Sequence, residues 1–272
     1  MLDQFQRRII MINHSNRLNF SFFIKILLIS CLALSFLFAQ AGKVKSILNE
    51  AEKLHDANNF SGTMTKLKEA EKLDKDNPEV LWKIARAYFD FADQDPENLD
   101  VQKKNLYPGF EYAKRCVELA PNVAGGHQYY AILIGRIGEI EGTKQKIQNS
   151  YPLKEHTMKA IELDPNNDGN YHVMGRWHYA LADLSWAERK IASLIYAKPP
   201  AASFDEAAKF FQKAHDLKPD DIRHLLWLGK TYIKLDQNDL ARKALNDALK
   251  IKAGSDSDKV MQTEASNLLK KL

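Results

Sequence analysis

Apolar and small residues recur along the C-terminal part of the chain at the spacing of amphipathic helices. In the last such unit, the polar turn at residues 236–238 separates two helical stretches, and large side chains fill one side of the first stretch. Small residues stand where two antiparallel helices would have to approach each other closely. The positions of this pattern are Leu225, Leu228, Gly229, Tyr232, Ala241, Leu245, Ala248 and Ile251.

The same pattern repeats along the chain, and the ending of its second helix occurs five times. The small residue of that ending is Ala70, Cys116, Ala160, Ala214 and Ala248. The last of these intervals matches the roughly 34-residue period of tetratricopeptide (TPR) repeats, which hold two helices per unit. The three earlier intervals are longer, so three units carry insertions, and the longest insertion lies in the unit that ends at Ala214.

These observations predict an all-α fold, a TPR-type α-solenoid of about five helix pairs with three intra-repeat insertions. Each insertion falls between the first and second helix of its repeat, on one edge of the solenoid. The longest insertion holds Leu184, Ile191 and Leu194 at helical spacing, so it predicts an extended or an additional helix. Residues 256–272 predict a C-terminal capping helix.

The N-terminal segment has the pattern of a targeting sequence. Residues 26–38 are apolar or small, follow Lys25 and precede Ala39-Gln40-Ala41, which is the order of a secretory signal peptide. The run is short of the roughly 20 apolar residues of a spanning helix. We therefore predict a signal peptide over residues 1–41, or alternatively an N-terminal anchor, followed by one TPR-like helical repeat domain over residues 42–272. A cleaved signal peptide predicts an exported protein, periplasmic or extracellular, and an uncleaved one predicts a membrane-anchored protein.

Charge and cysteine content exclude several classes of protein. The formal net charge is +4, but the segment 1–41 holds four basic side chains and one acidic side chain, which leaves +1 for the rest. This balance gives no argument for a nucleic-acid partner. The two cysteines, Cys31 and Cys116, exclude a disulfide scaffold and a Cys-rich zinc site. Cys116 occupies a small-residue packing position and is predicted to be an inert core thiol.

The sequence carries no motif for catalysis or metal binding. It contains no His-Glu-x-x-His, Cys-x-x-Cys, phosphate-binding glycine loop or Gly-x-Ser-x-Gly. His127 and His178 fall at positions that carry large packing residues, so packing is favoured over metal ligation. His172 and His178 are six positions apart and are not neighbours on a helix surface. We therefore predict no enzymatic activity, no cofactor and no metal.

Several segments of the chain resemble the regulator of microtubule dynamics family. The most specific of them is the longest insertion, with Ser185-Trp186, Arg189 and Pro199-Pro200. The resemblance implies a non-enzymatic helical repeat protein, associated in some members with microtubules or anchored to membranes. Together with the leader, it suggests an exported bacterial relative, or alternatively a membrane-anchored eukaryotic one. The resembling segments are residues 81–90, 111–119, 125–135, 153–165, 172–200, 204–214 and 225–235.

The leader also bears on the partner that the resemblance implies. Export would place tubulin out of reach, so microtubules are expected as a partner only if the repeat domain lies in the cytosol. Trp186 and Arg189 have two interpretations, since they either pack the insertion onto the solenoid or present a partner site. Packing is favoured because an added helix must bury an apolar face to be stable.

The best-supported function is binding through the concave face, which the first helices of TPR repeats line. Arg86, Arg176 and Lys230 share one register position, so successive helices would set them in a row about 10 Å apart. Cations beside aromatic side chains suit an acidic or amphipathic peptide. Alternatively, these cations are solvated and balanced by nearby acids such as Glu79. The predicted partner-binding residues are Trp82, Arg86, Phe89, Gln128, Ile132, His172, Arg176, Tyr179, Leu226 and Lys230.

Two functions of different kinds remain. The first is a protein–protein interaction scaffold that binds its partner in the concave groove. The second is a carrier of a lipid or another apolar ligand, because a curved helical repeat with a Tyr- and Trp-rich interior could enclose an acyl chain. The predicted groove is more polar than such a pocket requires.

Overall fold

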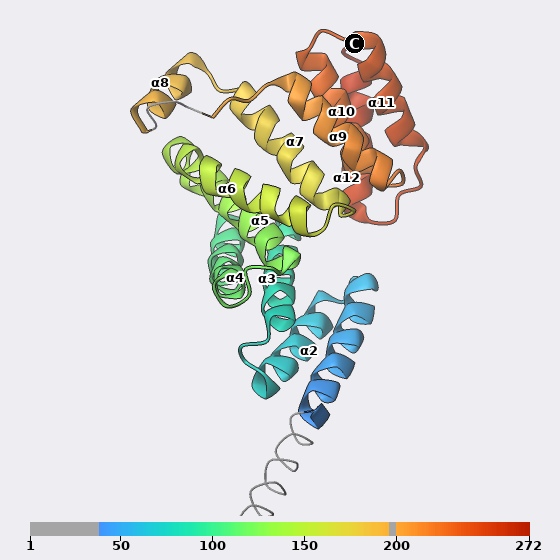
Figure 1. Ribbon diagram of the computed structural model, residues 1–272. Coiled ribbons are helices and arrows are strands. Elements are labelled where there is room, and N and C mark those ends of the chain that lie inside the picture. The colour runs from blue at the N-terminus through green and yellow to red at the C-terminus, as the bar shows by residue number, and fades with distance from the viewer. Residues whose placement is uncertain (1–37, 196–199) are drawn as a thin grey trace, which may run out of the picture. The chain divides into compact units, whose positions relative to one another are not determined.

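The computed structural model describes residues 38–195 and 200–272, and all regular elements in these ranges are α-helices (Figure 1). The chain divides into two compact units, Met1–Asp74 and Lys75–Leu272. The prediction of an all-α, TPR-type α-solenoid is confirmed. None of the described helices is long and apolar enough to cross a membrane.

The first unit contains one antiparallel helix pair, a helix over residues 38–56 and α2 (Phe60–Leu73). Asn58 takes a left-handed backbone (φ 57°) in the turn between them, which Asn tolerates better than most residues. The first helix continues through the predicted cleavage site, and the Gln40 side chain donates a hydrogen bond to the Leu73 carbonyl. The rest of the predicted signal peptide lies outside the described residues.

The second unit contains four further helix pairs, the separate helix α8 and a final helix. The pairs are α3 with α4, α5 with α6, α7 with α9, and α10 with α11. The helices are α3 (Pro78–Asp93), α4 (Leu99–Leu119), α5 (Ala124–Glu141), α6 (Thr143–Leu163), α7 (Asp168–Ala182), α8 (Trp186–Ile195), α9 (Phe204–Leu217), α10 (Ile222–Lys234), α11 (Asn238–Lys250) and α12 (Asp256–Leu269). The predicted capping helix corresponds to α12, which packs on α10 and α11.

The insertions enter the structure in two ways. The two shorter ones lengthen the second helices, so that α4 and α6 each have 21 residues. Each of these helices contains an internal proline, Pro108 in α4 and Pro152 in α6. The residues before the proline form an N-terminal extension of the helix. Proline is favoured in the first turn of a helix, and these two prolines come near the place where a repeat without an insertion would start its second helix. The longest insertion instead forms the separate helix α8.

Close approach of neighbouring helices, both within a pair and between successive pairs, depends on small residues. A Cβ on Gly175 would lie 2.6 Å from the ring of Phe211, and one on Gly126 would lie 2.7 Å from the Cys116 sulfur. Phe211 and Cys116 are both fully buried. Burial raises the pKa of the Cys116 thiol to about 11, which agrees with an inert core thiol.

The contact between Gly175 and Phe211 yields a test of the repeat packing. We expect Gly175→Ala to lower the free energy of unfolding by about 1–2 kcal/mol, because overpacking outweighs the gain in helix propensity. Urea unfolding of the purified chain measures this change. Gly254→Ala is the matched control, since the nearest atom to its Cβ would be 3.6 Å away. Equal destabilisation by both variants would contradict the assignment.

Candidate functional site

Three aromatic side chains of α3 and α5 meet on the side of the first helices. Trp82 stacks on Tyr129, with ring centroids 6.0 Å apart and an interplanar angle of 12°, and Phe89 lies 6.5 Å from the same ring. Lys83 and Arg86 lie over the Trp82 ring, 4.6 and 5.4 Å from its centroid. Trp82 and Phe89 are half-buried, so this group presents apolar area, whereas Lys83 and Arg86 are buried against the Trp82 ring, at 7% and 8% exposed.

A second group joins α7 and α10 around Trp227. The Arg176 guanidinium lies 4.0 Å and the Lys230 ammonium 4.2 Å from the centroid of the Trp227 ring. Tyr179 packs its ring edge-on against Trp227 at 5.3 Å. One indole therefore holds two of the cations that the sequence places at a shared register position. We call Arg176, Tyr179, Trp227 and Lys230 the Trp227 cluster.

Both cations of the Trp227 cluster are paired with acids from neighbouring helices. Arg176 lies 3.3 Å from Glu139 of α5, and Lys230 lies 2.7 Å from Glu264 of α12. Balance by nearby acids, the alternative considered for these cations, therefore holds for both. The acids differ from the expected one, because Glu79 lies 3.8 Å from Lys83 instead. Burial lowers the pKa of the Arg176 guanidinium, and the Glu139 carboxylate opposes that shift.

The structure corrects the predicted partner-binding set at three positions. Leu226 is 2% exposed because α12 packs beside α10 and covers it with Ala265. His172 and Arg86 are also buried, at 9% and 8% exposed. Side chains this deeply buried have little surface to offer a partner, and the other members of the set stay predictions. Register predicts the direction of a side chain but not the neighbouring helix that covers it.

The other predicted residues differ in their surroundings. The Gln128 amide exchanges hydrogen bonds with Asn167, at 3.1 and 3.4 Å, and thereby links α5 to the start of α7. Ile132 is half-buried on α5. The sequence analysis missed Tyr129 and Trp227, which lie at the centres of the two aromatic groups. Tyr129 follows Gln128 and Trp227 follows Leu226, and both preceding residues belong to the predicted set. A predicted surface that included one more position on each helix would have contained them.

Two pairs of histidines link neighbouring helices, and His156 is the one member that is half-buried rather than buried. The His127 Nδ1 lies 2.9 Å from the His156 Nδ1, and its Nε2 lies 2.8 Å from the Pro121 carbonyl. A carbonyl only accepts, so His127 carries its proton on Nε2 and accepts at Nδ1 from His156. Tyr130 stacks on His156 at 3.7 Å. Burial, reinforced by His127, lowers the pKa of His156 to about 4.

The second pair continues into a carboxylate. The Nδ1 atoms of His172 and His224 are 3.1 Å apart, and the His224 Nε2 lies 3.0 Å from Asp168. Burial, with the positive charge of Arg223 as the next cause, holds the pKa of His172 well below its usual value. His127 and His178 are both buried, and His178 stacks on Phe210, as the packing interpretation predicts. These contacts join α7 to α9 and α10.

Two groups among the described residues have ligand atoms close enough for a metal ion, Asp168 with Asp221 and His224, and Glu52 with His55 and Asp56. In the first group, Asp221 already accepts from the Arg223 guanidinium at 2.6 and 3.0 Å and caps α10. Its carboxylate is therefore engaged in holding the helix start, and the His224–Asp168 contact satisfies the buried imidazole.

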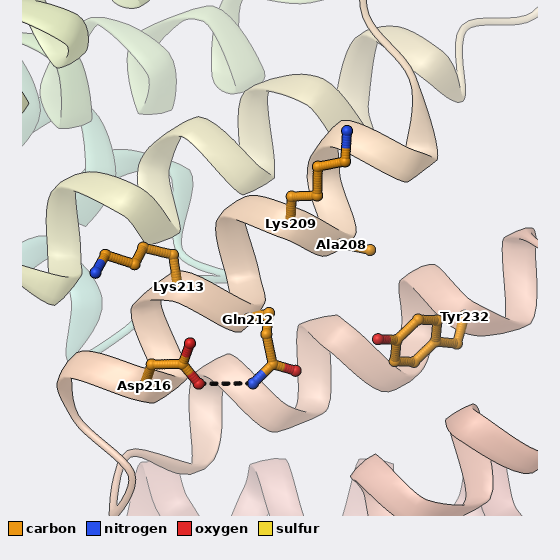
Figure 2. Close-up of a pocket in the computed structure, with 6 residues that line it drawn as sticks. All are labelled: Ala208, Lys209, Gln212, Lys213, Asp216 and Tyr232. Atoms are coloured by element: carbon orange, nitrogen blue, oxygen red, sulfur yellow. Dashed lines mark hydrogen bonds between the residues drawn. The ribbon is translucent and has the colours of Figure 1, made fainter.

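A shallow cavity of about 330 Å³ lies between α9 and α10 (Figure 2). Lys209 and Lys213 point away from Tyr232 in this view, and Gln212 donates a hydrogen bond to Asp216 at 2.8 Å. None of the predicted partner-binding residues lines it. Its charged lining does not suit an acyl chain. The lining residues are Ala208, Lys209, Gln212, Lys213, Asp216 and Tyr232.

The longest insertion departs from the packing expected of it. Trp186 is 71% exposed, so the prediction that it packs the insertion onto the solenoid was wrong. The insertion is instead attached through buried Leu184 and Ala192 and through Arg189, which donates to the carbonyls of Ala182 and Leu184. Pro200 is half-buried, and Pro199 lies outside the described residues.

The two histidine pairs predict acid sensitivity. The pKa of His156 is lowered to about 4 and that of His172 falls well below its usual value, so the unfolded chain binds protons that the folded chain does not. The contribution of these histidines to the free energy of unfolding is fully present above about pH 6.5, and it is lost as the pH drops toward 4. Urea midpoints measured between pH 8 and 4 should show this loss.

A variant isolates the contribution of one histidine pair. His156→Asn keeps a donor near His127 but does not titrate, so we expect a smaller loss of stability over the same pH range. His55→Asn in the first unit is the control, because half-buried His55 lies outside both pairs. An unchanged pH profile in His156→Asn would contradict this role of the pair.

Comparison with known proteins gives consistent results for sequence and fold. The family model described as "Regulator of microtubule dynamics protein 1-3" matches residues 47–272. Regulator of microtubule dynamics protein 1 of Mus musculus is 38% identical over 230 residues, which cover 84% of this chain and 74% of that protein. The protein of the same name from Caenorhabditis elegans is 30% identical, covering 81% of this chain and 97% of that protein.

A solved structure supports the fold alone. A thermophilic TPR protein of Thermus thermophilus superposes with a TM-score of 0.61 at 16% sequence identity, covering 82% of this chain and 99% of the other. The sequence relatives correct one prediction. They are animal proteins named for microtubule dynamics, and microtubules are cytosolic polymers, so the prediction of an exported protein, periplasmic or extracellular, was wrong.

Proposed function

Because the chain belongs to the regulator of microtubule dynamics family, we propose that it is a non-enzymatic TPR scaffold that binds an acidic or amphipathic segment of a protein partner. The binding surface is the side of the first helices that carries the Trp227 cluster and the Trp82–Tyr129 stack. The observation that carries this proposal is the placement of two cations, Arg176 and Lys230, on one half-buried indole.

The two cations combine accessibility with a fixed position. The Arg176 side chain is 39% exposed and that of Lys230 is 23% exposed, so a partner's carboxylates can reach both. Ion pairs at such exposure contribute little to stability, and exchanging Glu139 or Glu264 for a partner carboxylate costs correspondingly little. Contact with the Trp227 ring limits the movement of both cations before binding, which reduces the entropy lost in the complex.

Aromatic side chains supply the apolar part of the surface. Trp and Tyr with a neighbouring Arg are the residue types that dominate binding energy in protein interfaces. Trp82 with Tyr129 on one side, and Trp227 with Tyr179 on the other, provide two such anchors. A segment with apolar side chains between carboxylates would contact both kinds of group.

Microtubules are the partner to test first, because the sequence relatives are named as regulators of microtubule dynamics. The cations of the surface predict that binding weakens as salt increases and that polyglutamate competes with the partner. The carrier alternative gains no support from the cavity between α9 and α10, which is shallow and lined by charged residues.

Arg176→Glu tests the surface by charge reversal. The new carboxylate faces Glu139 and repels an acidic partner, so we expect at least about tenfold weaker binding, or about 1.4 kcal/mol. Co-sedimentation with stabilised microtubules, and fluorescence anisotropy with a labelled Glu-rich peptide, measure the change. Circular dichroism should show unchanged helicity.

The matched control is Arg242→Glu, the same reversal at an exposed position on α11. Equal binding by wild type, Arg176→Glu and Arg242→Glu would rule out the Trp227 cluster as the partner site. Loss of binding in Arg242→Glu as well would indicate a response to net charge rather than to the proposed surface.

A further inference from the structure

Helix α8 exposes two large apolar side chains on one side. Trp186 is 71% exposed and Leu194 is 86% exposed, and α8 stands at the edge of the second unit, away from α10–α12 (Figure 1). Trp186 and Leu194 are eight positions apart, which corresponds to about 12 Å along the helix and about 80° around its axis. Both side chains therefore face solvent on adjacent parts of the same side of α8. Ala192, which is buried, lies about 200° from Leu194 and about 240° from Trp186.

Polar contacts hold α8 in this orientation. Ser185 and Glu188 form a reciprocal cap, with the Ser185 hydroxyl accepting from the Glu188 amide at 3.3 Å and Glu188 accepting from the Ser185 amide at 2.8 Å. The Thr143 hydroxyl of α6 donates to the same Glu188 side chain at 3.4 Å. Arg189 caps the end of α7 through the Ala182 carbonyl at 2.7 Å. The helix is thus attached while its apolar side chains stay in solvent.

The surroundings of these side chains are positively charged. Lys190 lies over the Trp186 ring, 3.9 Å from its centroid. Lys146 of α6 is close enough to lower the pKa of Glu188, after the hydrogen bonds from Ser185, which act most strongly. Within the part of the chain that the structure describes, neither Lys190 nor Lys146 has a carboxylate within 4.0 Å, and the same holds for Arg189.

We propose that this surface docks an acidic amphipathic segment of a second protein, distinct from the segment bound by the Trp227 cluster. Trp186 and Leu194 would enter apolar contacts, and the cations around them would pair with carboxylates. An exposed Trp within a rim of unpaired charge has the composition of an interface anchor. We call it the α8 surface, and it consists of Trp186, Arg189, Lys190 and Leu194 with Lys146.

Charge and shape favour an acidic protein over two other occupants. A second copy of the chain in a symmetric pair would bring Lys190 and Arg189 against their own copies, which like charges oppose. A helix that lies in a membrane interface buries a broad apolar face along its length. On α8, Lys190 separates the two exposed apolar side chains, and Ile191 and Ala192 turn toward the protein.

The test uses a fluorescein-labelled Glu-rich peptide with leucines at alternating helical spacings of three and four, titrated with the full chain. The titrations are made in the Arg176→Glu background, in which binding at the Trp227 cluster is expected to be weaker by about tenfold or more. We expect Trp186→Ala and Lys190→Glu each to weaken binding about tenfold or more. Val260→Ala on α12 and Lys252→Glu after α11, both at exposed positions, are the matched controls and should bind as the background does.

Three results would overturn the proposal. The first is no binding of the peptide, or equal binding by the α8 variants and the controls. The second is binding to phosphatidylserine–phosphatidylcholine vesicles that Trp186→Ala abolishes, without binding of the peptide. The third is a concentration-dependent dimer that Trp186→Ala dissociates. Because the background already lacks Arg176, failure here leaves the Trp227 cluster untouched, and circular dichroism verifies that each variant folds.

Discussion

The rest of the structure depends on the close approach of the two helices in each repeat. Gly175 against Phe211 and Gly229 against Leu245 leave no room for a Cβ, since its distance to the facing side chain would be 2.6 Å in both cases. The side chains of Phe211 and Leu245 therefore pack directly against the glycine backbones. This close packing fixes how the two helices of a pair lie together, and therefore how the next pair stacks on them. A solenoid follows from the repetition of this one contact.

This constraint also explains where extra sequence is tolerated. The packed segments of each pair must keep their spacing, whereas the ends of the helices and the connections between them can grow. In α4 and α6 the added residues continue the helix, and at α8 they form a separate one. All the additions therefore fall at one kind of position, the connection between the first and second helix of a repeat.

The repeat period predicted most of the fold. It indicated the helix pairs, the insertions and the capping helix, because each depends on local periodicity and on small residues at fixed positions. It failed where the exposure of a side chain depends on another element. Leu226 points as its register predicts, yet α12 covers it. Trp186 was expected to be buried because isolated helices need packing, but a cap and Arg189 hold α8 instead.

Charge pairing separates the two surfaces of the second unit. Around Trp227, each cation already has a carboxylate from a neighbouring helix, so binding of an acidic partner is an exchange of one ion pair for another. Because this exchange of ion pairs changes the binding free energy little, the net gain comes from apolar contact with the Trp227 indole. The surface therefore favours a partner that also covers this ring. On α8 the cations have no such carboxylate among the described residues, and binding there forms new pairs on a surface that stays in water. The first surface therefore selects mainly by apolar fit, and the second responds more strongly to salt.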